Sequence, residues 1–181
     1  MELQRLSVKL LAEETNINAT EFVPVFHSWI RNKKLKDHLM IDVADYNHVP
    51  EGPGTLLVTH EGNYSLASDD GKLSLLYQRK RFHEGTISVR LNTALKAVLN
   101  AAEFLEQEAE FKGRLSFERI RFWGISNDRL NLPNTEQAFE QLRPALAEIA
   151  EEFFAHDHFS LSRHGERKEP LSILVESNVL N

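Results

Sequence analysis

The chain has 181 residues and no cysteine, and its 21 Lys and Arg against 27 Asp and Glu give a formal net charge of −6. This length fits a single domain over residues 1–181. The missing cysteine excludes thiol nucleophiles, disulfides, iron–sulfur clusters and cysteine zinc sites, and it favours a reducing, cytoplasmic location. No apolar run approaches the ~20 residues of a membrane span, and the first residues lack a signal-peptide pattern, so we expect no membrane association.

The acidic balance disfavours nucleic-acid binding, because contacts to phosphates need cations. Two local basic clusters run against this balance, and we interpret them as solvated faces or helix ends. They are Arg31, Lys33, Lys34 and Lys36, followed by Arg79, Lys80 and Arg81.

The first half of the chain predicts strands and one short helix. Alternating apolar residues predict a strand over 6–10, and helical spacing predicts a helix capped by Thr20 and running to Arg31. Two prolines and two glycines make 49–54 a loop. Strands over 55–59 and 73–77 flank a third short strand, and Asp70-Gly71 predicts a two-residue hairpin turn, so these strands form an antiparallel meander.

The second half predicts two long helices and a closing hairpin. An apolar stripe predicts a helix over 91–109, with Ser88 as its cap and Gly113 as its stop. Residues 117–123 favour a strand. A second helix opens at Asn134 and carries Pro144 inside its stripe, which predicts a kink or two abutting helices. Two short strands then enclose 165–170. Because each helix must bury one face, we expect an α+β fold in which an antiparallel sheet, a β-meander, carries two long helices packed on one face.

A polar concentration between residues 42 and 64 is the first candidate site. Its carboxylates and imidazoles suit general acid–base work or a divalent metal, which would make the protein a metal-assisted hydrolase. The residues assigned to such a catalytic site are Asp42, Asp45, His48, His60 and Glu61. The loop 49–54 would have to bring the two halves together.

Ordinary turn chemistry explains the same residue types, and strand parity puts Asp42 and Asp45 on opposite faces. We therefore assign no metal ligand set and predict no cofactor. His156 and His158 form a smaller metal candidate, for which a role at a helix end is the stronger interpretation.

Two arginine pairs form the second candidate site. Arg119 and Arg121 would share one strand face with Phe117 and Trp123, and this arrangement could hold a planar anion. Arg79 and Arg81 also share a parity, and Tyr64 is a further candidate ligand-binding residue. If the two strands were neighbours, the four arginines would form one basic patch. Pairing of the arginines with glutamates of the flanking helices is the alternative.

Standard catalytic signatures are missing from the sequence. It contains no phosphate-binding loop, nucleophile elbow or zincin motif, and Gly52-Pro53-Gly54 lacks the third glycine of a dinucleotide fingerprint. The preferred hypothesis is a non-catalytic, self-associating binding protein for a small anionic molecule or a protein partner. The metal-assisted hydrolase is the alternative, so the sequence leaves open whether the protein is an enzyme.

Four segments carry a resemblance to other proteins: 39–49, 52–54, 60–64 (His-Glu-Gly-Asn-Tyr) and 127–130 (Asn-Asp-Arg-Leu). They resemble an uncharacterised bacterial protein family, and the resemblance extends over most of the chain. It implies a bacterial, cytoplasmic origin, and it implies no activity, ligand or catalytic residue.

Overall fold

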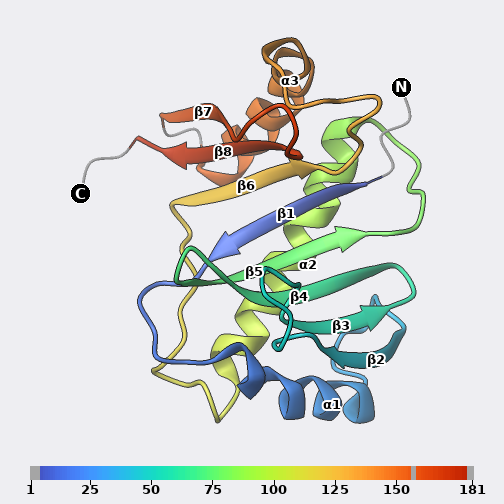
Figure 1. Ribbon diagram of the computed structural model, residues 1–181, viewed down its shortest axis with the longest axis vertical. Coiled ribbons are helices and arrows are strands. Elements are labelled where there is room, and N and C mark those ends of the chain that lie inside the picture. Colours follow the sequence, from blue (N-terminus) through green and yellow to red (C-terminus); the bar gives the residue numbers. More distant parts are fainter. Residues whose placement is uncertain (1–4, 156–157, 179–181) are drawn as a thin grey trace.

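The computed structural model describes residues 5–155 and 158–178 and shows an α+β fold (Figure 1). Its strands are β1 (Leu6–Leu11), β2 (Met40–Asp45), β3 (Thr55–Thr59), β4 (Gly62–Asp69), β5 (Lys72–Arg79), β6 (Arg121–Ser126), β7 (Phe159–His164) and β8 (Leu171–Ser177). Its helices are α1 (Phe22–Asn32), α2 (Ile87–Gln107) and α3 (Glu136–Phe153), with a 3-10 turn, η1 (Ala19–Glu21), before α1.

All eight strands belong to one sheet in the order β2-β3-β4-β5-β1-β6-β8-β7, and each neighbouring pair is antiparallel. The predicted meander is the run β2 to β5. The amino-terminal strand β1 is inserted between β5 and β6, so α2 connects two strands that run in the same direction on either side of β1. In the same way, α3 connects β6 to β7 across β8.

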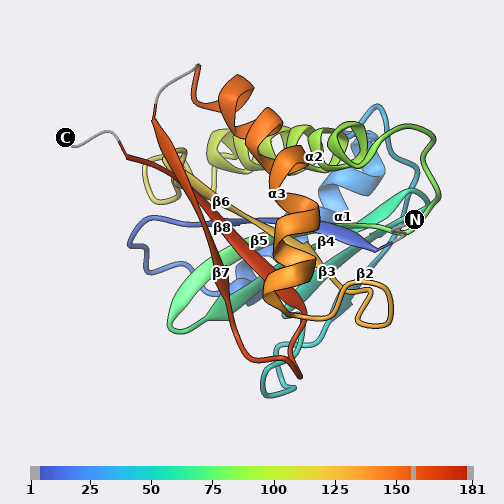
Figure 2. The same cartoon turned by 90° about the horizontal axis from the view of Figure 1, so that it is seen from above.

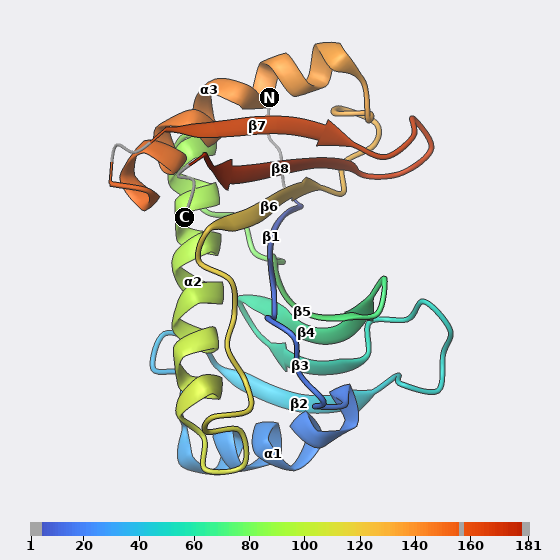
Figure 3. The same ribbon diagram turned by 90° about the vertical axis from the view of Figure 1, so that its left-hand side faces the viewer.

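The helices lie on one side of the sheet, which we call the covered face (Figures 2 and 3). Helix α2 packs on β1 and β5, α3 packs on α2, β7 and β8, and α1 packs on β2. The two predicted long helices are therefore confirmed on one face. The other side, which we call the open face, carries no helix of the described residues. None of the helices in the described part of the chain is long and apolar enough to span a bilayer.

The hydrophobic core lies between the covered face and the helices. Leu10, Leu75 and Ile173 point from three strands into this layer, and Val98 and Ala150 meet them from the two long helices with no exposed surface. Alternation along each strand explains the division, because successive side chains leave opposite faces of a sheet. Residues between these core positions therefore reach the open face.

Several local predictions are confirmed. Strand β3 has the predicted bounds, the loop 49–54 connects β2 to β3, and β7 and β8 enclose the polar hairpin. The Asp70-Gly71 turn joins β4 to β5, and both residues have positive φ, 48° and 80°. This is the backbone conformation that a two-residue hairpin requires at both central positions.

The predicted helix caps are wrong by one or two residues. The cap before α1 is Asn18 and not the predicted Thr20. The side chain of Asn18 accepts the N–H of Thr20 and forms a capping box with Glu21 at the start of η1. Thr86 caps α2 in place of Ser88, and Thr135 caps α3. Asn134 instead donates its side-chain amide to carbonyls of the β7–β8 hairpin. Several polar residues that can act as caps stand before each helix, so the residue types alone do not single out the cap.

Two further expectations are met only in part by the structure. Pro144 is accommodated inside one continuous 18-residue helix, α3, so the chain does not break into two abutting helices there. The strand predicted over 117–123 begins only at Arg121. Phe117 makes an isolated bridge with Ala12, and bends at residues 119–120 interrupt the ladder.

Candidate functional site

The residues of the predicted hydrolase site lie at opposite ends of the β2–β3 hairpin. Asp45 pairs with Thr55 at the loop end, whereas His60 and Glu61 follow Thr59 at the other end. Five strand residues separate the two levels, which corresponds to roughly 17 Å. The loop 49–54 therefore does not bring Asp45 and His48 to His60 and Glu61.

Asp42 and Asp45 have local structural partners. A register shift separates Met40 from Asp42, and the Oδ1 of Asp42 accepts the N–H of Val43 at 2.8 Å. The backbone N–H of Asn47 and its side-chain amide both donate to Asp45, at 3.0 and 2.6 Å, and these hydrogen bonds lower the pKa of Asp45. The two carboxylates thus satisfy the edge strand and the turn after it. They also point to opposite faces, as strand parity predicts.

Within residues 5–155 and 158–178, no group of three or more His, Asp or Glu side chains is arranged to hold a metal ion. His48 is exposed on the loop after β2. His156, of the smaller metal candidate, lies outside the described residues. The hydrolase hypothesis therefore has no convergent ligand set in the described part of the chain.

The four arginines do not form one patch, because β1 separates β5 from β6. Ser7 pairs with both Gln78 and Ile125, so these two residues are level with each other. Arg79 and Arg121 consequently lie about five residues apart along the strands, or roughly 17 Å.

Arg119 and Arg121 have carboxylate partners on the protein. Arg119 pairs with Glu106 of α2 at 3.1 Å, and Arg121 pairs with Glu118 at 2.7 Å. The bends at 119–120 also break the expected face. Phe117 is buried in the core, whereas Trp123 lies on the open face, where the Nζ of Lys9 is 5.0 Å from its ring centroid. Arg119 therefore pairs with a glutamate of a flanking helix, which was the alternative to an anion site.

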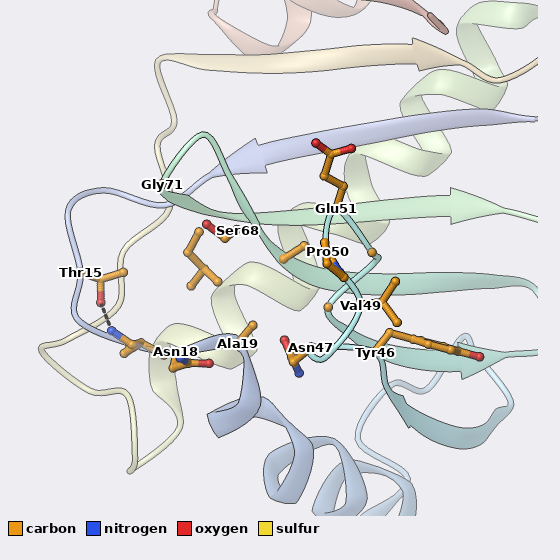
Figure 4. Close-up of a pocket in the computed structure, with 15 residues that line it drawn as sticks. Thr15, Asn18, Ala19, Tyr46, Asn47, Val49, Pro50, Glu51, Ser68 and Gly71 are labelled. Atoms are coloured by element: carbon orange, nitrogen blue, oxygen red, sulfur yellow. Dashed lines mark hydrogen bonds between the residues drawn. The ribbon is translucent and has the colours of Figure 1, made fainter.

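A cavity of about 410 Å³ lies between the loop 49–54, the segment before α1 and the β4–β5 turn (Figure 4). Three of its polar side chains make internal contacts. Thr15 donates to the carbonyl of Arg114, Asn18 caps η1, and Asn47 donates to Asp45 and Thr55. These contacts hold the segments around the cavity in place.

A second cavity of about 400 Å³ lies on the covered side, between the segment after α1, the β3–β4 turn and α2. We call it the basic pocket. Its lining residues are Leu35, Lys36, Asp37, His38, Glu61, Tyr64, Arg79, Thr93, Lys96, Ala97 and Asn100. The α2 residues among them recur at helical spacing, so one face of that helix forms a wall. Glu61, Tyr64 and Arg79 are sequence-predicted site residues that the fold does bring together.

His38 stands at the centre of this pocket between two tyrosines. Its Nε2 lies 2.8 Å from the hydroxyl of Tyr77 and 3.4 Å from that of Tyr64. The three rings also contact one another, with centroid separations of 4.7 to 5.4 Å. Lys33, with φ 49°, ends α1 in the left-handed conformation and turns the chain toward this cluster.

Burial keeps the cluster uncharged at neutral pH. It lowers the pKa of His38 from its ordinary value, while the charges of Glu61 and Asp37 oppose this change and that of Arg79 adds to it. Burial also raises the pKa of both Tyr64 and Tyr77. The tautomer of the neutral imidazole decides whether Nε2 accepts a hydrogen bond from the Tyr77 hydroxyl or donates one to it.

Glu61 is ionised and held by the backbone. Partial burial raises its pKa, but the N–H of Leu39, which donates to Oε2 at 2.9 Å, and the nearby histidines lower the pKa below its ordinary value overall. The carbonyl of Glu61 also accepts the N–H groups of Lys80 and Arg81. The β3–β4 turn is thereby tied to the end of β5. Arg81 itself is exposed, with one guanidinium nitrogen 3.4 Å from the Nδ1 of His60.

Gly62 lets Tyr77 reach this position. A Cβ atom at Gly62 would lie 2.7 Å from both the Cζ and the hydroxyl oxygen of Tyr77. The glycine is therefore required by close packing inside a strand, which is a recognised reason for glycine there.

The pocket is positively charged on an acidic protein. Lys36, Arg79 and Lys96 outnumber the carboxylates of Asp37 and Glu61, so its lining carries a net charge of +1. In the described part of the chain, none of the three cations forms an ion pair. The Nε of Arg79 is buried and has no hydrogen-bond partner there.

Sequence reasoning missed His38 and Lys96 as site residues. His38 follows the first basic cluster, whose pattern predicts a solvated segment. Lys96 lies on the predicted polar face of a helix. The glycine at the start of a strand, Gly62, was the available signal of a close approach.

Comparisons of the chain with protein-family models, with curated proteins and with solved structures found no match.

Proposed function

We propose that this protein is a non-catalytic binding protein that holds a small anionic molecule in the basic pocket. The observation that carries the proposal is a set of three cations around one cavity of about 400 Å³ that have no carboxylate partner in the described part of the chain. This volume falls in the range of small-molecule sites. Arg79 is partly buried and its Nε has no hydrogen-bond partner in the described part of the chain, so an anion would supply a partner to it and a counter-charge to the exposed Lys36 and Lys96.

Neutral groups would complete the recognition. Thr93 and Asn100 line the same cavity from α2, and Tyr64 lines it from β4. The hydroxyl of Tyr64, which lies 3.4 Å from the Nε2 of His38, could also turn toward an acceptor on the ligand. Carboxylate, sulfate and phosphate groups are acceptors of this kind.

Isothermal titration calorimetry with sulfate and with citrate, at constant ionic strength set by chloride, tests the proposal. We expect saturable binding of at least one of the two anions to the wild-type chain. Arg79→Ala removes a charge-assisted hydrogen bond and should weaken binding about 10- to 100-fold.

Arg143→Ala is the matched control, because Arg143 lies on α3 and pairs with Glu140 on the surface. Circular dichroism confirms that both variants fold. The proposal is overturned if neither anion binds the wild-type chain, or if Arg79→Ala binds as tightly as Arg143→Ala.

A further inference from the structure

The open face of the sheet carries a row of polar side chains that crosses the strands. Asn63 of β4 stands opposite Gln78 of β5, and Gln78 stands opposite Ser7 of β1. In the next row, Ser65 stands opposite Leu76, which stands opposite Lys9. Neighbouring strands are about 4.8 Å apart, so Asn63 and Gln78 present hydrogen-bonding groups at that interval, whereas Ser7 is fully buried and its hydroxyl accepts the side-chain amide of Asn127.

Two loops make this region a groove. The loop 49–54 and the β7–β8 hairpin both project on the side away from the helices (Figures 2 and 3). Glu51, Gly52 and Pro53 from the loop and Glu169 from the hairpin line a cavity of about 850 Å³ over β4, β5 and β1. We call it the open-face groove.

The central polar side chains of the groove lack partners on the protein. The Oδ1 of Asn63 is buried without a hydrogen bond in the described part of the chain. Across residues 5–155 and 158–178, no side-chain hydrogen bond is formed by Gln78 or Ser65 either. On the covered face, by contrast, the buried hydroxyls of Thr55 and Thr59 are both hydrogen-bonded. An orphaned buried amide calls for an explanation, and a bound molecule or water is the ordinary one.

The groove has the opposite charge to the basic pocket. Its carboxylates are Glu51, Asp69, Asp70 and Glu169, and its one cation, Lys9, is paired with Asp69. The resulting net charge of −3 repels anions. The apolar side chains Leu56, Leu76 and Ile125 lie among the polar ones on the same surface.

We propose that the open-face groove binds a neutral, polyhydroxylated molecule of the saccharide class. Each amide offers a donor and an acceptor side by side, and this pairing suits adjacent hydroxyl groups. Carboxylates accept hydrogen bonds from hydroxyl groups and do not repel a neutral ligand. The apolar side chains can pack against the C–H face of a sugar ring. An extended peptide fits less well, because the polar row runs across the strands and offers no free backbone edge for β-pairing.

Titration of the full ¹⁵N-labelled chain with maltotriose and with cellotriose, followed by NMR, tests this inference. The side-chain NH₂ signals of Asn63 and Gln78 are assigned by their loss in Asn63→Ala and Gln78→Ala. We expect both signals to shift saturably with at least one sugar. Gln78→Ala should weaken that binding about 3- to 10-fold, since one hydrogen bond is lost.

Gln141→Ala, at an exposed position on α3, is the matched control and should bind as the wild type does. Arg79→Ala should also bind the sugar normally, so the result does not depend on the basic pocket. The inference is overturned if neither sugar shifts the two amide signals, or if Gln78→Ala binds as tightly as Gln141→Ala. Shifts caused only by a short peptide such as trialanine would reassign the groove and likewise overturn it.

Discussion

Replacing Gly62 by alanine should destabilise the protein through crowding alone. The backbone of Gly62 is outside the left-handed region, so alanine can adopt it without strain. The added Cβ would nevertheless lie 2.7 Å from the Tyr77 ring and hydroxyl, and 2.7 Å from the carbonyl oxygen of Gln78. Tyr77 is fully buried and holds His38 at 2.8 Å, so it cannot move away without losing that hydrogen bond.

The expected loss follows from these two contributions. Overpacking of a well-filled site costs about 1–3 kcal/mol, and the hydrogen bond to His38 contributes about 1 kcal/mol. Together they lower the free energy of unfolding by about 2–4 kcal/mol. For a chain of this length the entropy of unfolding is about 0.4 kcal/mol per degree, so Tm should fall by about 5–10 °C.

Thermal unfolding followed by circular dichroism measures this fall, with Ser65→Ala on the same strand as the control. In a double-mutant cycle, Tyr77→Phe removes one of the crowded atoms, so the double variant should lose less than the sum of the two single variants. A Tm for Gly62→Ala within about 2 °C of the wild type would refute the reasoning. Strict additivity in the cycle would also refute the contact between Gly62 and the Tyr77 hydroxyl.

Two further predictions concern the pH dependence of stability and the sheet edge. Burial lowers the pKa of His38 in the folded state, so between that lowered pKa and about pH 6.5 the unfolded chain binds more protons than the folded chain. The free energy of unfolding should therefore fall by up to about 1.4 kcal/mol per pH unit as the pH decreases through this range. Denaturant unfolding across this range should show a flatter profile for His38→Gln, and identical profiles would contradict the assignment. Asp42→Ala removes the acceptor of the Val43 N–H, beside the exposed Ile41 on an edge strand, so light scattering should show increased self-association. Asp42→Asn keeps an acceptor at this position, so its self-association should change less. An unchanged molar mass for Asp42→Ala would count against edge protection.

Local patterns predicted the elements of this fold well where a short segment determines its own conformation. The period-2 run in β3 and the Asp70-Gly71 turn need only neighbouring residues to specify them. The place of β1 between β5 and β6 is different, because its pairing partners lie about 70 and 120 residues along the chain. The strand pattern of β1 is the same whichever strands flank it, so its position was beyond local reasoning.

In the candidate site, too, local patterns identified some of the residues, whereas their arrangement depends on contacts between distant segments. Residue types and turn positions were enough to single out Glu61, Tyr64 and Arg79. Their convergence with His38 depends on α1 ending at Lys33 and on contacts between segments 26 and 39 residues apart. The sequence of each basic cluster, taken alone, predicts a solvated segment. Only the fold brings Lys36 of the first cluster and Arg79 of the second to one cavity.

Both proposed sites depend on one strand pairing, that of β4 with β5. Arg79 lines the basic pocket and Tyr77 contacts His38 there, whereas Gln78 between them lines the open-face groove with the opposite charge. A slip of one residue would exchange the two faces and place the arginine among the carboxylates of the groove. The Asp70-Gly71 turn sets the register at one end of the pair, and the close contact of Gly62 with Tyr77 sets it at the other. Selection for both ligands would therefore act on these turn and glycine positions, although neither the turn nor Gly62 contributes a side chain to the basic pocket.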